Sequence, residues 1–390
     1  MSTSQLQPRM SGDILSPGDV IRPSLTPGQA GELLTKLYGL TPRSVKEFNS
    51  YDDRNFYFTV AETVEEKPDI WPDGYILKVT NRQDSRNLLF SDAQNKMILH
   101  MSAAGLAVPV PVTNLQGDLQ SLEKLEGAGT SSQNIVRLLR FIPGKTLYEV
   151  EPWTPAHFSQ CGQFIAKMDL ALASYKHPGY DNRNSIWYLS SVPDVKQFLF
   201  AVEDEVKRKL AEEIITEFSA TVKPAEDQLE KSVIHGDFNE QNILCRENSA
   251  GQQEIFSVID FGDSNYNPLL YELGITIMYM MTKCSLISPN LAGGHVIAGY
   301  IKHRDLTSLE RRLVRTCVAA RYVQSLVMGA YSYSQDPGNE YLLITSKTGW
   351  ETLASFWSLS QAELYAGWDQ VISSYFSPGQ HDNYLTSSSQ

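Results

Sequence analysis

Two carboxylates stand on polar loops beside short apolar segments, and this arrangement suits one kind of chemistry. Asp237 precedes the predicted strand Ile243 to Cys245, and Asp260 follows the predicted strand Phe256 to Ile259. Phosphoryl transfer relies on positioning and on metal ions that neutralise the phosphates, so it needs a base and a metal ligand of this kind. We interpret Asp237 as the base and Asp260 as the metal ligand.

The spacing of these residues narrows the interpretation. Asn242 lies five residues after Asp237, and Asp260 is followed directly by Phe-Gly. This order is typical of the catalytic loop and the metal loop of protein kinases. Two unrelated turns would rarely produce it by chance. One position differs, because a Gly separates His235 from Asp237 where protein kinases have Arg.

The His-Gly-Asp sequence, followed by IDFGD, resembles the aminoglycoside phosphotransferase family, whose members phosphorylate hydroxyl groups of small molecules. The resemblance extends over residues 42–350. Within the family, HGDFNEQNIL, IDFGD, SYDDRNF, AARYVQSLVMGAYSYS and SKTGW are most similar to members that phosphorylate 5-hydroxylysine. The resemblance implies an α+β, bilobal, protein-kinase-like fold with a β-rich N-lobe and a mainly helical C-lobe. It also implies GTP as the donor, with ATP as the alternative, and a role in lysine degradation.

The length and composition are compatible with such a fold. The chain has 390 residues, 42% of them hydrophobic and 20% charged. A single core rarely serves more than about 250 to 300 residues, which favours two lobes. We expect a mobile lead-in at 1–27, the N-lobe at 28–143, the C-lobe at 144–376 and a frayed tail at 377–390.

Charge and hydropathy exclude several classes of partner. The net charge of -12 disfavours nucleic acid, whose binding relies on basic patches. No apolar run reaches the 18 or more residues of a membrane span, and the start of the chain lacks the features of a targeting segment. The four cysteines show no metal-binding or redox spacing. We expect a cytoplasmic protein that binds a nucleotide and a small amino acid, with no obligate protein partner.

The predicted N-lobe contains a hairpin that would cover the nucleotide phosphates. Its strands are expected at Ser44 to Asn49 and Phe56 to Ala61, joined by a polar loop. Protein kinases have a Gly-rich loop here, and this loop has no glycine. The family resemblance implies that Ser50 and Asn55 contact the nucleotide instead.

Lys78 interrupts the apolar strand Tyr75 to Val79, where an unpaired cation would be costly. In a kinase this lysine binds the nucleotide α and β phosphates and pairs with an acidic residue of the next helix, expected at 88–104. Asp92 is the expected partner, although kinases usually have Glu there, and Glu123 is an alternative.

The N-lobe is expected to end in a hinge at residues 141–144, where the backbone of Phe141 would bind the base edge. Helices should follow at 154–173, 193–222, 270–281 and 307–331. Trp187 and Tyr188, on a loop between the first two, are consistent with a substrate pocket, although core packing is the more frequent role of such aromatic residues.

The resemblance assigns the remaining site residues. Asn242 and Asp260 would hold Mg²⁺, which prefers oxygen ligands, and Asp237 would accept the proton of the acceptor hydroxyl. His235 would brace the catalytic loop rather than act as the base. Glu272 occupies the place of a family acidic residue that braces the same loop.

Two residues are expected to bind the substrate. Asp263 follows the metal loop and should lie within reach of a substrate amine. Arg321 shares an inward helical stripe with Leu313 and Cys317. A buried arginine needs an acidic partner, so Arg321 forms either a structural salt bridge or a contact with a substrate carboxylate.

Three alternatives remain open. The first is a kinase for homoserine, choline, a sugar or an aminoglycoside, whose motifs would be the same. A protein kinase is disfavoured because the Gly-rich loop and an Ala-Pro-Glu sequence after Asp260 are missing. An inactive kinase-like binding module is disfavoured because Lys78, Asp237, Asn242 and Asp260 are all present.

Overall fold

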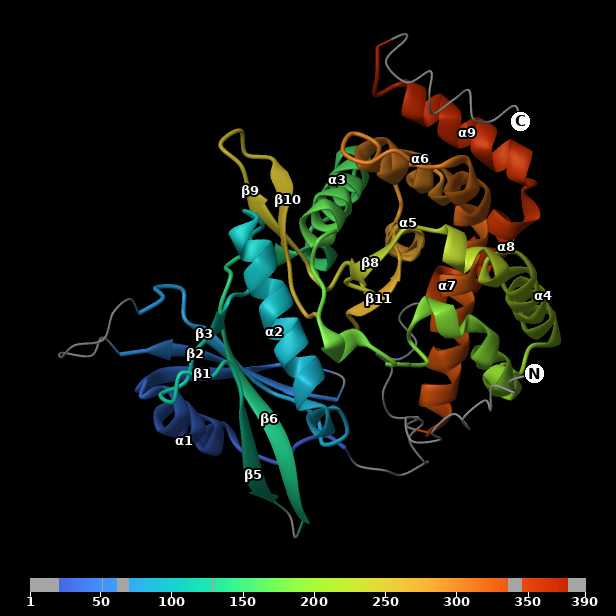
Figure 1. Ribbon diagram of the computed structural model, residues 1–390. Coiled ribbons are helices and arrows are strands. Elements are labelled where there is room, and N and C mark those ends of the chain that lie inside the picture. The colour runs from blue at the N-terminus through green and yellow to red at the C-terminus, as the bar shows by residue number, and fades with distance from the viewer. Residues whose placement is uncertain (1–20, 51, 62–69, 128–129, 336–345, 378–390) are drawn as a thin grey trace, which may run out of the picture.

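The computed structural model describes residues 21–50, 52–61, 70–127, 130–335 and 346–377. Within this part of the chain a β-rich N-terminal lobe is followed by a mainly helical C-terminal lobe (Figure 1). The predicted α+β bilobal fold is confirmed. The predicted lead-in and tail lie largely outside the described residues.

The N-terminal lobe is built on a six-stranded antiparallel sheet. Its order is β1-β2-β3-β6-β4, with β5 paired to β6. Helix α1 has a capping box at Thr26 and ends at Gly39, which is in the left-handed conformation. The elements of this lobe are α1 (Pro27–Tyr38), β1 (Pro42–Phe48), β2 (Arg54–Val60), β3 (Tyr75–Val79), the 3₁₀ turn η1 (Asp84–Arg86), α2 (Leu88–Ala103), β4 (Pro111–Val112), β5 (Ser121–Gly127) and β6 (Thr130–Arg140).

The C-terminal lobe contains helices around two short antiparallel strand pairs, β8 with β11 and β9 with β10. The short strand β7 adds to the second pair beside β9. Its first part comprises β7 (Lys145–Thr146), η2 (Leu147–Glu149), α3 (Pro155–Leu172), η3 (Pro178–Tyr180), η4 (Leu189–Ala201), α4 (Glu205–Thr221) and η5 (Lys223–Gln228). Its second part comprises β8 (Lys231–Ile234), β9 (Ile243–Glu247), β10 (Gln253–Val258), β11 (Asn265–Pro268), α5 (Leu269–Thr282), α6 (Pro289–Tyr300), α7 (Ser308–Gln335), α8 (Ser346–Ser358) and α9 (Gln361–Ser373).

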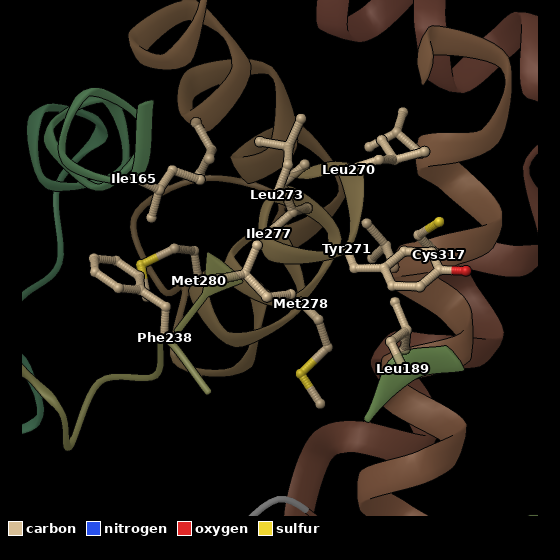
Figure 2. Close-up of a cluster of buried hydrophobic side chains, with 14 of the residues drawn as sticks. Ile165, Leu189, Phe238, Leu270, Tyr271, Leu273, Ile277, Met278, Met280 and Cys317 are labelled. Carbon is tan, nitrogen blue, oxygen red and sulfur yellow. The ribbon is translucent and has the colours of Figure 1, made fainter. Parts of the chain in front are cut away.

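Helix α5 lies in the core of the C-terminal lobe, because apolar side chains cover its whole circumference. Figure 2 shows Leu273, Ile277 and Met280 of this helix in a cluster that includes Phe238. Phe238 is fully buried and stacks on Phe164, with 5.8 Å between the ring centroids. The residue next to Asp237 is therefore fixed in the core.

The structure differs from the prediction at one helix and at one strand of the N-terminal lobe. The helix expected at 193–222 is divided into η4 and α4, because Pro193 lies within the first segment and cannot donate the backbone hydrogen bond of an α-helix. Strand β5 was not predicted. Its sequence SLEKLEG has only two apolar residues and no strict alternation, but it pairs with β6 along its whole length.

Candidate functional site

Two antiparallel strand pairs hold the catalytic loop and the metal loop side by side. Strand β8 pairs with β11, and β9 pairs with β10. The catalytic loop connects β8 to β9, and the metal loop connects β10 to β11. Because each loop joins one strand pair to the other, the two loops cross the same gap in opposite directions. The residues expected to do the chemistry are therefore brought together by local pairing.

Gly236 explains the His-Gly-Asp sequence. Its φ is 80°, a left-handed conformation that favours glycine. A Cβ atom at this position would lie 2.5 Å from the backbone oxygen of Asp263 and 2.6 Å from the side chain of Asn265. The metal loop thus approaches the catalytic loop too closely for any side chain, including the arginine of protein kinases.

Four side chains hold the carboxylate of Asp237 in one orientation. Its Oδ1 accepts hydrogen bonds from Arg321 Nη2 (2.8 Å) and Tyr279 Oη (3.2 Å). Its Oδ2 accepts from Asn239 Nδ2 (2.7 Å) and Asn242 Nδ2 (3.2 Å). The side chain is still 22% exposed, so an acceptor hydroxyl can reach a carboxylate that is already oriented.

Arg321 forms a structural ion pair rather than an open carboxylate site. Besides Asp237, its guanidinium donates to Gln324 Oε1 (2.8 Å) and to the backbone oxygen of Trp187 (3.1 Å). Only 2% of the side chain is exposed. The expectation that Arg321 binds a substrate carboxylate therefore needs correction. A guanidinium already paired and buried in this way presents no surface to a ligand.

His235 and Glu272 brace the catalytic loop. His235 Nε2 donates to the backbone oxygen of Ile259 (3.0 Å), and its Nδ1 accepts from the backbone N–H of Asp237 (3.2 Å). The ring thus links the two loops and has no proton-accepting nitrogen left for the acceptor. The buried Glu272 accepts from the backbone N–H of Gly236 (3.1 Å), as its family position implies.

Lys78 pairs with two carboxylates. Its Nζ lies 2.8 Å from Asp260 Oδ1 and 3.1 Å from Asp53 Oδ2, and the residue is 8% exposed. Burial lowers the pKa of Lys78, but the two carboxylates outweigh burial and raise that pKa above its ordinary value. Asp53 also accepts from the backbone N–H of Asn81 (2.8 Å). The loop over the phosphate site therefore supplies the second acid.

The expected pairing of Lys78 with Asp92 is wrong. Asp92 forms an ion pair with Lys96 (2.7 Å) and accepts a hydrogen bond from His177 Nε2 (3.1 Å). The alternative partner, Glu123, forms an ion pair with a lysine of α1. Asp92 lies on a face of α2 that contacts the C-terminal lobe, and its short side chain meets those partners instead.

Asp260 has the properties of a metal ligand. The charge of Lys78 lowers the pKa of Asp260 to about 2, so this carboxylate is ionised at neutral pH. Its side chain is 45% exposed. Asn242 turns its amide nitrogen towards Asp237. These oxygen-bearing side chains fit Mg²⁺, which is often held by few protein ligands together with substrate phosphates. The described residues contain no group of three His, Cys, Asp or Glu side chains that would hold a metal alone.

Helix α2 contacts the metal loop through Gln94. Gln94 Nε2 donates to the backbone oxygens of Phe261 (2.9 Å) and Gly262 (3.3 Å), while its Oε1 accepts from Arg137 Nη1 (3.0 Å). A guanidinium can only donate, so Arg137 fixes the orientation of the Gln94 amide. Arg137 lies opposite Lys78 in the β3–β6 pairing. Gln94 thereby joins the N-terminal lobe to the loop of Asp260.

Replacing Gln94 with Met should weaken the binding of Mg²⁺ and leave metal-free nucleotide binding unchanged. Methionine has a similar length but cannot donate to the metal loop, and outer residues of this kind typically alter metal affinity by about 10- to 100-fold. Titration of a fluorescent nucleotide at several Mg²⁺ concentrations measures the effect. Gln163→Met on α3 is the control, and equal Mg²⁺ dependence in both variants would contradict the role of Gln94.

The other nucleotide-site predictions have mixed support. Ser50 donates a hydrogen bond to the backbone oxygen of Asp53, which helps to shape the loop over the phosphates. Asn55 lies opposite Lys78 in the β2–β3 pairing, and its buried Oδ1 has no hydrogen-bond partner among the described residues. Both residues stand near Lys78, as a nucleotide-binding role requires.

The predicted hinge contact of Phe141 needs correction. Its backbone N–H donates to Gly74 (3.0 Å), and its backbone oxygen accepts from Trp71 Nε1 (2.7 Å). Its ring packs on Tyr57, with 4.5 Å between the centroids. Because both backbone groups are already bonded within the sheet region, Phe141 has no free backbone edge for a base.

Asp263 lies close to Asp237 in an acidic environment. Burial and the charge of Asp237 raise the pKa of Asp263 to about 7, although Arg321 opposes this shift. Its backbone oxygen accepts from Asn265 (2.7 Å). The ionised form of a carboxylate that is destabilised in this way is stabilised by a cationic ligand.

Sequence reasoning missed Asp53, Gln94 and Arg137. The double aspartate in SYDDRNF was a signal for the first, since a nucleotide site has little use for two acids unless a cation pairs with one of them. Arg137 is a charged residue in the otherwise apolar run IVRLL, a pattern like that of Lys78. Gln94 left no comparable signal.

The fold and these two loops define a kinase-like phosphotransferase. The model of the phosphotransferase enzyme family matches residues 44–306, and the chain belongs to this family. It is accordingly a phosphotransferase with a hydroxyl group as acceptor.

The relatives are small-molecule kinases. Hydroxylysine kinase of Xenopus laevis is 33% identical over 364 residues, which cover 91% of this chain and 96% of the relative. Amicoumacin kinase hAmiN, solved with AMP-PNP, Ca²⁺ and Ami, has a TM-score of 0.60 at 16% identity and covers 89% of this chain and 94% of its own. Aminoglycoside 2'-phosphotransferase-IIIa, solved with GDP, has a TM-score of 0.51 at 19% identity, with coverages of 83% and 95%. The two solved structures show the fold alone.

Among the described residues, no helix is both long and apolar enough to cross a membrane.

Proposed function

We propose that the protein transfers the γ-phosphoryl group of GTP, or alternatively ATP, to the side-chain hydroxyl of 5-hydroxy-L-lysine. The observation that carries this proposal is the similarity to hydroxylysine kinase along almost the whole chain, 33% over 364 residues. The oriented carboxylate of Asp237 supports it, because such a group suits an alcohol acceptor. The related structures hold GDP in one case and AMP-PNP in another.

In the proposed mechanism, Asp237 orients the acceptor hydroxyl and takes its proton as the phosphoryl group arrives. Arg321 and Tyr279 keep the carboxylate in place during this step. Lys78 exchanges a carboxylate partner for the nucleotide phosphates. Asn242 and Asp260 would hold Mg²⁺, which would supply positive charge to neutralise the phosphates.

Several finer assignments belong to the same proposal. Ser50 and Asn55 contact the nucleotide, and His235 supports the catalytic loop. The lobes extend over 28–143 and 144–376. We place the protein in the cytoplasm, in lysine degradation, without nucleic acid, membrane or an obligate protein partner.

The proposal is tested by a coupled assay of nucleotide turnover with GTP and ATP against a panel of acceptors. 5-Hydroxylysine should be phosphorylated with the highest kcat/KM, and lysine, which lacks the hydroxyl, should not react. A higher kcat/KM on homoserine, choline, a sugar or an aminoglycoside would replace the proposed acceptor. Absence of turnover on every acceptor would favour an inactive binding module.

The role of Asp263 predicts a pH dependence of the acceptor KM. In the acceptor-free protein the pKa of Asp263 is raised to about 7 by burial and by Asp237. The ionised form, which binds an ammonium group, therefore becomes dominant as the pH rises through 7, and KM for 5-hydroxylysine should fall between pH 6 and pH 8. The Asp263→Asn variant should show a higher KM that hardly changes over this range. A wild-type pH profile in the variant would remove Asp263 from the acceptor site.

A further inference from the structure

The loop at residues 183–188 is hydrogen-bonded to α7, the helix whose Arg321 binds the carboxylate of Asp237. Arg321 Nη1 donates to the backbone oxygen of Trp187 (3.1 Å). Gln324 Nε2 donates to the backbone oxygens of Ile186 (2.7 Å) and Tyr188 (3.0 Å). Both donors come from α7, and Arg321 also binds Asp237. The position of this loop is therefore fixed relative to the catalytic carboxylate.

Arg183, on this loop, is held in place without a close carboxylate. Its Nε donates to Tyr188 Oη (2.8 Å), and its guanidinium carbon lies 3.4 Å from the centroid of the Phe90 ring. The nearest carboxylate oxygen among the described residues, Asp84 Oδ1, is 3.7 Å from its Nη2, and the Asp84 side chain is 49% exposed. An ion pair this long and this exposed contributes little.

The two Nη atoms of Arg183 make no hydrogen bond in the described part of the chain. Nε donates to Tyr188, and Nη2 has the long contact with Asp84. The stack on Phe90 fixes the plane of the guanidinium, which reduces the entropy lost when a ligand binds. The side chain is 19% exposed, in contrast to the fully enclosed Arg321.

Opposite charges meet around the hydroxyl of Tyr188. Burial raises the pKa of Tyr188 to about 12; Arg183 lowers that pKa and Asp263 raises it. Arg183 donates directly to this hydroxyl, and the negative charges of Asp263 and Asp84 also act on it. Trp187, next to Tyr188, is bound by the same Arg321 that holds Asp237. A cation on this loop and the carboxylates around it match the carboxylate and the ammonium groups of an amino acid.

We propose that Arg183 binds the carboxylate of the amino-acid acceptor, beside Tyr188. The inference rests on the proposed function and adds to it the residue that selects an α-amino acid over an amino alcohol. It assigns to Arg183 the role for which Arg321 is too enclosed. Discrimination arises because an acceptor without a carboxylate leaves the guanidinium unpaired.

The test compares two acceptors in the wild type and in Arg183→Met, a neutral variant of similar length. The acceptors are 5-hydroxylysine and its decarboxylated counterpart, a hydroxylated diaminopentane. The wild type should prefer 5-hydroxylysine in kcat/KM by about 10- to 100-fold, the usual effect of one charge-assisted hydrogen-bonded pair. In the variant this preference should fall to about one, mainly through KM. Because the preference is a ratio within one sample, partial unfolding does not affect it.

The control is Arg246→Met, since Arg246 also pairs with a carboxylate and lies over an aromatic ring, but on the β9–β10 hairpin. This variant should keep the wild-type preference. An unchanged preference in Arg183→Met overturns the inference, as does a wild type that uses both acceptors equally. An equal loss on both acceptors with a raised KM for GTP overturns it in favour of a phosphate contact. Failure of the wild type to phosphorylate 5-hydroxylysine overturns the proposed function and this inference together.

Discussion

The Asp237→Asn variant should lose turnover by a factor of about 10² to 10⁴ while it binds nucleotide almost as the wild type does. This range is typical for loss of a positioned general base. An asparagine oxygen can still accept from Arg321 and Tyr279, so that side of the site is preserved. Its amide nitrogen would face the amide donors of Asn239 and Asn242, and it cannot take a proton from the acceptor.

Single-turnover kinetics and calorimetric nucleotide titration in the presence of Mg²⁺ separate the two effects. Asp227→Asn is a matched control, because the Asp227 side chain is 98% exposed and forms an ion pair with Lys231, away from the site. The control should retain the wild-type kcat. A kcat near the wild-type value in Asp237→Asn would show that another group accepts the proton. A parallel loss of nucleotide affinity would instead indicate that the loop had collapsed.

The two loops can be predicted from the sequence because their geometry is local. The predicted strands next to Asp237 and Asp260 pair with each other as β9 and β10, and this pairing brings one end of each loop to the same place. The second pair, β8 with β11, was not predicted. The division into two lobes can be predicted for a similar reason. The spacing of apolar residues along a segment indicates whether that segment forms a strand or a helix. The close approach at Gly236 also has a local sequence signal, because a glycine stands where a side chain would collide.

The partners across the site cannot be predicted in the same way. Helical periodicity identified Arg321 as buried, but its partner Asp237 lies 84 residues away and is defined only by the packing of α7 against the loop. The orientation of α2 likewise decides that Gln94 and not Asp92 faces the metal loop. The predicted hinge contact of Phe141 is wrong for another reason. The backbone hydrogen bonds that occupy Phe141 leave no side-chain pattern in a sequence.

The Asp260→Ala variant should lose the Mg²⁺-dependent part of its nucleotide affinity. Asp260 is ionised at neutral pH because Lys78 lowers its pKa to about 2, and it is 45% exposed at the site. Mg²⁺ has few protein ligands in such a site, so the loss of one carboxylate should lower metal affinity by about 100-fold or more. Activity should fall with it, because the metal neutralises the phosphates during transfer.

Nucleotide titrations with and without Mg²⁺ measure this effect without requiring turnover. In the variant, Lys78 keeps Asp53 as its partner at 3.1 Å, so the lysine remains charged and can still bind phosphate. Metal-free nucleotide affinity should therefore be equal to that of the wild type or higher, since one competing carboxylate is gone. Asp118→Ala, in an exposed turn, is the control and should retain the full Mg²⁺ effect. If Mg²⁺ still strengthens binding in Asp260→Ala as much as in this control, the metal is held elsewhere.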